Sequence, residues 1–185
     1  MPKAQVVIAL DMDGVLISTA GALYRIFDEF TAKYGGRATT ELFEFYNGKK
    51  IVEVVRDLSV RFKYTQSEEH LLADYFSRIE EIYKTCELQA GALEFLKYCR
   101  QSNIPVCLAT GANRSVAETV LESTKTSSYF DFTVCADDVQ NGKPSPEMYL
   151  KIKDRFPADL YIAVDDADNG IQGARAAGMK AYLFG

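Results

Sequence analysis

The sequence is poor in residues that several kinds of functional site require. Histidine occurs once in 185 residues, at His70 in a polar stretch, so the four cysteines lack the histidine partner of a catalytic thiol. The cysteines are scattered with no CxxC pair, which is typical of reduced core cysteines. Lysine and arginine form no run and the formal net charge is −5, which argues against nucleic-acid binding.

Long apolar runs are also missing. No stretch approaches the ~20 residues of a membrane-spanning helix. The start Met1-Pro2-Lys3 leads directly into a short apolar segment and does not resemble a signal peptide. We therefore expect a cytoplasmic protein, a monomer or weak dimer, with no membrane or nucleic-acid partner. Its length suits one core-bearing domain, or a domain with a small insertion.

The apolar pattern divides the chain into a helical block and an alternating block. Residues 19–88 have helical spacing, and Val52, Val55 and Leu58 are expected to face inward from one of these helices. After residue 88, short apolar strands alternate with helices, which predicts a parallel sheet with helices on both faces. The predicted fold class is α/β, a Rossmann-like core over 1–18 and 89–185 with an inserted α-helical unit over 19–88. Expected strands are 6–10, 105–109, 132–135, 160–164 and 180–184; expected helices are 20–34, 40–46, 51–62, 67–88, 92–102, 116–123, 146–156 and 170–177.

Asp11 and Asp13 directly follow the first predicted strand. Side chains alternate in extended backbone, so these two acids are expected to point the same way and Met12 the other. Gly14 allows a sharp turn there. Two converging carboxylates repel each other, so a cation or a shared proton is expected between them.

Polar residues also follow two later strands of the predicted sheet. Thr110-Gly111-Ala112 follows one strand, Asp165-Asp166 follows another, and Lys143 lies in a loop ahead of a helix. Ligands of open parallel sheets bind at the carboxyl ends of the strands, so these groups are expected on one rim. Carboxylates with phosphate favour Mg²⁺, whereas Lys143, Thr110 and the backbone amides that follow can hold phosphoryl oxygens. A carboxylate can attack phosphorus, and a second acid can protonate the leaving oxygen.

The motifs resemble the haloacid dehalogenase superfamily, in its phosphatase and phosphomutase branch. The matching segments, in the family's order, are Asp11-Met12-Asp13-Gly14-Val15-Leu16, Leu108-Ala109-Thr110-Gly111, Gly142-Lys143-Pro144-Ser145-Pro146-Glu147 and Val164-Asp165-Asp166-Ala167-Asp168-Asn169-Gly170-Ile171. The helical insertion is similar to the family's small cap. The resemblance implies that Asp11 is the nucleophile and Asp13 the general acid and base. It also implies that Thr110 and Lys143 bind phosphate, and that Asp165 or Asp166 ligates Mg²⁺ with Asp11 and the backbone carbonyl of Asp13.

Several residues have a second interpretation. Thr110 could instead cap the following helix, a role that Asn113 also suits. Lys143 could be a surface lysine, and Asp168 is expected to be a helix cap or a supporting group. Gly111 and Ala112 are expected to line the substrate site. Lys49 and Lys50 belong either to a specificity loop of the cap that contacts substrate or to a solvated loop.

The expected activity is Mg²⁺-dependent hydrolysis of a small phosphate monoester, such as a sugar phosphate, through a phosphoaspartate. A sugar phosphomutase of the β-phosphoglucomutase type is the alternative, because Thr19 occupies the hinge where such enzymes carry threonine. However, Leu23 and Tyr24 stand where their cap histidine is usual. A non-catalytic module that binds a phosphorylated ligand is disfavoured, because it would gain nothing from a nucleophile beside an acid. Members of the family commonly continue for another helix and strand beyond the point that Gly185 occupies.

Overall fold

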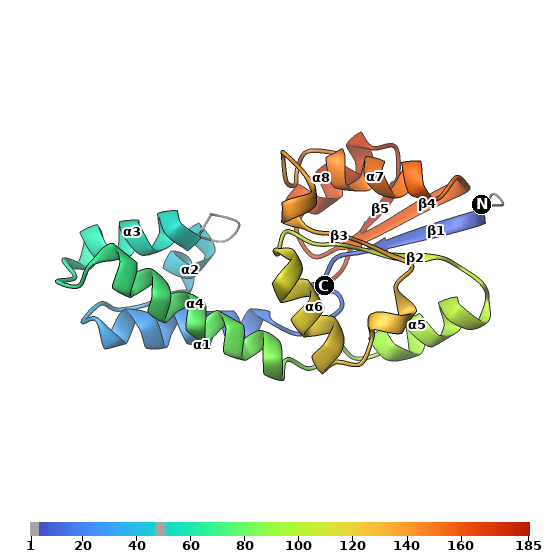
Figure 1. Ribbon diagram of the computed structural model, residues 1–185. Helices are drawn as coiled ribbons and strands as arrows, with labels where there is room; N and C mark the ends of the chain where they lie inside the picture. The colour runs from blue at the N-terminus through green and yellow to red at the C-terminus, as the bar shows by residue number, and fades with distance from the viewer. Residues whose placement is uncertain (1–3, 47–50) are drawn as a thin grey trace. The chain divides into compact units, whose positions relative to one another are not determined.

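The computed structural model describes residues 4–46 and 51–185 (Figure 1). The chain divides into two compact units. One combines Met1–Ser18 with Cys86–Gly185, and the other is Thr19–Thr85. Met1, Pro2 and Lys3, where the absence of a signal peptide was expected, lie outside the described residues. Among the described residues, no helix combines the length and the apolar character that crossing a bilayer requires.

The first unit is built on a five-stranded parallel sheet. Its strand order is β3-β2-β1-β4-β5, so the first strand lies in the middle and pairs with β2 on one side and β4 on the other. Leu10 pairs with Leu108 and with Val164, which brings the carboxyl ends of three strands to one level. The strands are β1 (Ala4–Leu10), β2 (Val106–Ala109), β3 (Phe132–Val134), β4 (Ala158–Asp165) and β5 (Lys180–Leu183).

Helices cover both faces of this sheet, which confirms the predicted fold class (Figure 1). On one face lie α7 (Glu147–Arg155) and α8 (Asp168–Ala176), and on the other α5 (Ala92–Gln101) and α6 (Arg114–Ser123). Short 3₁₀ turns, Ser127–Tyr129 and Ala136–Asp138, flank β3. The core under α7 and α8 consists of small and apolar side chains of the strands and the two helices, among them Val7, Ala9, Cys107, Ala109, Ala163, Met148, Ile152 and Ala174.

The edge strand β5 is the least buried part of the sheet. Tyr182, Leu183 and Phe184 are exposed, and Phe184 borders an apolar groove of about 290 Å³ that Phe95 and Leu16 also line. The cysteines agree with the expectation of reduced thiols: Cys99, Cys107 and Cys135 are buried, Cys86 is half-buried, and none of these four described residues forms a disulfide bond.

The second unit consists of α1 (Ala20–Lys33), α2 (Thr40–Tyr46), α3 (Ile51–Phe62) and α4 (Glu68–Thr85). Phe27, Phe30, Val55 and Leu58 lie in its core. The expectation for Val52 is wrong, because this side chain is 37% exposed and Val54 is buried instead. Val54, Val55 and Leu58 make the inward stripe of α3, with the spacing of one helix face.

The helix predicted over 67–88 ends earlier, at Thr85. Leu88 forms an antiparallel bridge with Ile17, and the amides of Ser18 and Gln89 donate to the carbonyls of Glu87 and Leu16. Backbone groups that pair with a distant segment cannot also continue a helix. The two segments that connect the units, at residues 16–18 and 87–89, are therefore hydrogen-bonded to each other within the first unit.

Candidate active site

Asp11 occupies the centre of the sheet's carboxyl edge. Its amide donates to the carbonyl of Val164 at 3.0 Å, so pairing with β4 continues one residue past β1. Its side chain is buried, and Met12 beyond it is fully buried. The chain then turns at Gly14, whose φ of +76° is a left-handed conformation that favours glycine. The amide of Gly14 donates to Ile17, which closes a tight loop after the two acids.

Two glycines make room for the carboxylates of Asp165 and Asp166. A Cβ atom on Gly14 would overlap the carboxylate of Asp166, and a Cβ on Gly170 would overlap that of Asp165. Asp165 is buried, whereas Asp166 is exposed. The absence of a side chain at these two positions therefore lets Asp166 approach the loop after β1 and lets Asp165 lie against α8.

Lys143 lies between two of these acids. Its Nζ is 2.5 Å from Oδ1 of Asp11 and 2.7 Å from Oδ2 of Asp165, and its side chain is 12% exposed. The alternative of a surface lysine is therefore wrong. The peptide bond from Lys143 to Pro144 is cis. Both carboxylates share one ammonium group, which offsets part of their mutual repulsion in a buried setting.

Asp165 has hydrogen-bond donors on both of its oxygens. Oδ1 accepts the amide of Ala167 at 3.0 Å, and Oδ2 accepts the hydroxyl of Tyr149 at 3.1 Å in addition to Lys143. Tyr149 did not emerge from the sequence analysis as a site residue. The sequence does place a tyrosine on the apolar face of a predicted helix. Because a buried tyrosine hydroxyl usually needs a hydrogen-bond partner, this position could have indicated a polar contact in the core.

Burial and neighbouring charges shift the pKa values of Asp11, Asp166 and Lys143. Burial, opposed by the charge of Lys143 and assisted by the charges of Asp165 and Asp13, raises the pKa of Asp11 to about 7. Burial, followed by the charge of Asp165, also raises the pKa of Asp166. Burial alone would lower the pKa of Lys143, but Asp11 and its other neighbours raise it above the ordinary value, so the lysine stays charged.

Three acids converge closely enough that they could hold a metal ion. One carboxylate oxygen from each of Asp11, Asp165 and Asp166 lies within 4.8 Å of the other two. When ionised, these three groups and Lys143 together carry two net negative charges. Oxygen ligands and this charge fit a small divalent cation such as Mg²⁺. The carboxylate of Asp13 is outside this group of three, and the role expected for Asp13 in metal binding uses its backbone carbonyl.

The loop after β2 brings Thr110 to the same edge. Thr110 is 1% exposed, its amide donates to Val134, and its hydroxyl accepts the amide of Ala112 at 3.0 Å. The alternative that Thr110 caps the next helix is wrong, because Asn113 is the N-cap of α6 and accepts the amide of Val116 at 3.0 Å. Gly111 is exposed, and Ala112 is half-buried.

Asp13 lies in the loop after β1, where it forms a backbone bridge with Ile17 and is half-buried. The carbonyl of Gly14, which follows Asp13, is held by Gln89, a residue that the sequence did not indicate. Nε2 of Gln89 donates to the carbonyl of Gly14 at 2.8 Å. Nothing in the local sequence around Gln89 indicates this contact, since its partner is 75 residues away.

Three residues singled out from the sequence remain: Lys49, Lys50 and Asp168. Lys49 and Lys50 fall outside the described residues. Asp168 is exposed and is the first residue of α8, whose N-cap is Ala167, so the expectation of a cap at Asp168 is wrong. The helix begins one residue earlier than a capping aspartate would require, because the amides of Gly170 and Ile171 donate to the carbonyl of Ala167.

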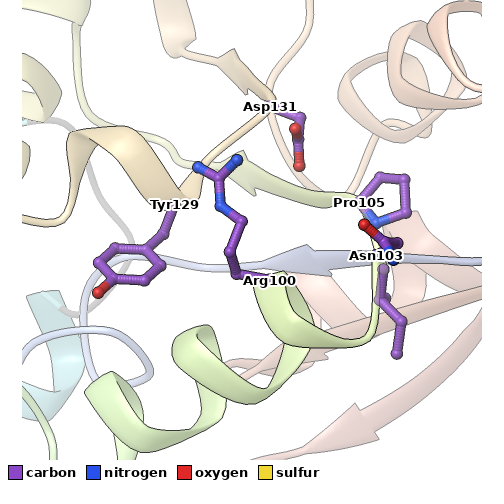
Figure 2. Close-up of a pocket in the computed structure, with 6 residues that line it drawn as sticks. Arg100, Asn103, Pro105, Tyr129 and Asp131 are labelled. Carbon is purple, nitrogen blue, oxygen red and sulfur yellow. The ribbon is translucent and has the colours of Figure 1, made fainter.

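A separate hollow of about 170 Å³ opens at the other end of the sheet (Figure 2). It lies where β2 and β3 begin, and Figure 2 shows Arg100 extending from α5 toward the segment that carries Tyr129 and Asp131. The carboxylate of Asp131 accepts the amide of Val106 at 3.0 Å, which makes it a structural contact. This hollow does not include any of the predicted site residues.

Comparisons with known proteins agree with the resemblance that the sequence motifs indicated. A family model described as haloacid dehalogenase-like hydrolase matches residues 6–178. A (DL)-glycerol-3-phosphatase from Arabidopsis thaliana is 27% identical over 95% of this chain and 78% of its own. A phosphorylated carbohydrates phosphatase from Thermotoga maritima is 26% identical over 94% and 82%. The crystal structure of a β-phosphoglucomutase from Clostridium difficile has the same fold, with a TM-score of 0.76 and 22% identity over 97% of this chain and 84% of its own.

Proposed function

Because the chain belongs to the haloacid dehalogenase-like hydrolase family, we propose that it hydrolyses a small phosphate monoester, such as a sugar phosphate, in a Mg²⁺-dependent reaction through a phosphoaspartate. The observation that carries the proposal is the buried carboxylate of Asp11, which lies 2.5 Å from the Lys143 ammonium and beside Asp165 and Asp166. A nucleophile, a phosphate-binding cation and a metal-binding pair of acids thus meet in one place.

In the first step, an oxygen of Asp11 attacks the phosphorus atom and the bond from phosphorus to the ester oxygen breaks. Asp13 donates its proton to that leaving oxygen, and the alcohol departs. In the second step, Asp13 takes a proton from water, and the water oxygen attacks the phosphorus of the aspartyl phosphate. Inorganic phosphate leaves and the Asp11 carboxylate is restored.

Lys143 and the loop after β2 would hold the phosphoryl oxygens. Lys143 provides a fixed positive charge, and Thr110, Gly111 and Ala112 offer a hydroxyl and backbone amides. Lys143 already contacts Asp11, so a phosphoryl group held by the ammonium would lie next to the attacking oxygen.

Asp11, Asp165 and Asp166, with the backbone carbonyl of Asp13, would hold Mg²⁺. When bound, the ion offsets the negative charge of the acids and of the phosphoryl group. The three carboxylates that converge within 4.8 Å support this assignment. Without a divalent cation, the negative charge of these carboxylates would repel an anionic phosphate ester.

The helical unit would act as the cap that selects the substrate. We propose that the cap extends over residues 19–88, that the core comprises 1–18 and 89–185, and that Lys49 and Lys50 contact the substrate. The relatives named as phosphatases of glycerol 3-phosphate and of phosphorylated carbohydrates support a small phosphorylated metabolite as the substrate class. A monomer or weak dimer in the cytoplasm is the proposed working form.

The test is phosphate release from a panel of small phosphate monoesters, with Mg²⁺ and with EDTA. Wild type should release phosphate only with Mg²⁺, and Asp11→Asn should lose nearly all turnover while staying folded. Asp154→Asn is the matched control, because it makes the same change at an exposed position of α7. A fully active Asp11→Asn variant would refute the mechanism. Conversion of a sugar phosphate into its isomer without phosphate release would identify a mutase instead.

A further inference from the structure

Tyr149 has a hydroxyl group that core packing does not explain. The residue lies in the first turn of α7, is 2% exposed and belongs to the apolar core under α7 and α8. A phenylalanine would supply the same ring to this core. The hydroxyl instead donates to Oδ2 of Asp165 at 3.1 Å, at the edge of the candidate site. Burying a hydroxyl is costly unless it forms such a bond, so the contact with Asp165 is what makes tyrosine acceptable here.

The oxygen that accepts this hydroxyl is the same one that binds Lys143. Oδ2 of Asp165 therefore has two donors, at 3.1 and 2.7 Å, while Oδ1 accepts the amide of Ala167 at 3.0 Å. Donors on both oxygens prevent the carboxylate from rotating. Loss of the Tyr149 hydroxyl would leave Lys143 as the remaining donor to Oδ2, and the lysine and the carboxylate could then move together.

The Tyr149 ring is itself held in place. A Cβ on Gly173 of α8 would lie 3.2 Å from the ring carbon Cε2, 3.0 Å from the carbonyl oxygen of Ser145 and 3.2 Å from that of Pro144. The loop that carries Lys143, the helix α8 and the tyrosine ring therefore pack tightly around one glycine. The Nζ of Lys143 also lies 6.0 Å from the centre of the ring. Tyr149 thus contacts the surroundings of Lys143 through both its hydroxyl and its ring.

We propose that Tyr149 is a positioning residue, which fixes Asp165 and thereby holds Lys143 where it binds the phosphoryl group. The inference rests on the proposed function in taking Lys143 as the phosphate-binding cation and in loading the site with Mg²⁺. Tyr149 itself does not contact the phosphoryl group. By fixing Asp165, Tyr149 keeps the Lys143 ammonium in contact with both Asp11 and Asp165. The ammonium is then already in place to bind the phosphoryl group.

The test is a calorimetric titration of inorganic phosphate into the Mg²⁺-loaded protein, which requires no turnover. Tyr149→Phe keeps the ring and removes the hydroxyl, and it should weaken phosphate binding roughly tenfold, as expected for a hydrogen bond to a charged group. Tyr161→Phe is the matched control. Its hydroxyl also has two hydrogen-bond partners, Phe156 and Ala158, and a lysine, Lys153, lies 5.1 Å from its ring centre. This control should bind phosphate as wild type does.

A double variant separates positioning from simple loss of stability. If Tyr149 acts through Asp165, then adding Tyr149→Phe to Asp165→Asn should weaken phosphate binding by less than about twofold, because the two residues act as one unit. Wild-type binding by Tyr149→Phe would overturn the inference, as would losses that multiply in the double variant. A protein that binds phosphate in this pattern but releases none from any ester would refute the hydrolase proposal and leave the role of Tyr149 intact.

Discussion

The helix residue Gly170 lies against the carboxylate of Asp165 so closely that any side chain at position 170 would overlap it. Asp165 in turn accepts a hydrogen bond from Lys143, which contacts Asp11. The first turns of α8 therefore define the position of the acids and of the lysine. A glycine within a helix costs stability relative to alanine, and here this cost permits the close approach of the Asp165 carboxylate.

This relationship predicts the effect of Gly170→Ala. The added methyl group must displace Asp165, and with it Lys143, so phosphate release should fall about a hundredfold, as expected when a reacting group moves by about 1 Å. Gly21→Ala is the control, since position 21 is also inside a helix but has open space around its Cβ. Steady-state kinetics of both variants gives the answer. Equal activity of Gly170→Ala and wild type would mean that Asp165 is not held as described.

Lys143→Met should destabilise the protein. The substitution leaves the buried carboxylates of Asp11 and Asp165 without their shared cation, and breaking a buried pair in this way costs about 3–5 kcal/mol. Added Mg²⁺ should restore part of the loss, because it offsets the same charges. Urea unfolding with Mg²⁺ and with EDTA measures both effects. Lys84→Met, which removes an exposed ion pair with Glu80, should unfold like wild type.

Asp74 should make the stability of the helical unit depend on pH. Burial would raise the pKa of Asp74, but Lys33, Tyr34 and Arg78 donate to its carboxylate and lower the pKa below the ordinary value. A lowered pKa in the folded state stabilises the fold above the unfolded value, near 3.9, and this contribution is lost as pH falls through the folded value.

Asp74→Asn should therefore cost about 1 kcal/mol at pH 7, and its difference from wild type should shrink below about pH 4. Thermal unfolding between pH 3 and 7 measures this difference, with Asp28→Asn at an exposed position of α1 as the control. A difference that stays constant across this range would contradict the role given to the carboxylate.

Gln89→Leu should impair turnover more than phosphate binding. The side-chain amide of Gln89 donates to the carbonyl of Gly14, directly after Asp13. Loss of this bond frees the loop that carries the proposed acid, so kcat should fall roughly tenfold, with the affinity for inorganic phosphate unchanged. Gln101→Leu, at an exposed position, should have neither effect. A Gln89→Leu variant with normal kcat would show that the loop does not need this contact.

The sequence predicted the parts of the structure that depend on local patterns. The sheet, its helices and the gathering of Asp11, Lys143 and Asp165 at one edge follow from apolar spacing and from the rule that ligands bind at the carboxyl ends of parallel strands. The contact between Lys143 and Asp11 spans 132 residues, so the local pattern indicated the edge on which the lysine lies but not its partner.

Contacts between distant segments account for what the sequence could not predict. In the sequence, Tyr149 has the pattern of an ordinary core residue, and only the structure shows that its hydroxyl donates to Asp165. The hydrogen bond from the Gln89 amide to Gly14 is likewise visible only in the structure. The helix expected to reach residue 88 stops at Thr85, because Leu88 pairs with Ile17. Apolar periodicity gives no information about such pairings, and it also failed to distinguish Val52 from Val54 on α3.

The most direct test of the account is acid quenching during turnover of p-nitrophenyl phosphate with Mg²⁺, followed by mass spectrometry of the protein and its peptides. The phosphoaspartate mechanism predicts one added phosphoryl group, located on Asp11, that is absent with EDTA and absent in Asp11→Asn. A phosphoryl group on another residue, or sustained turnover by Asp11→Asn, would contradict it.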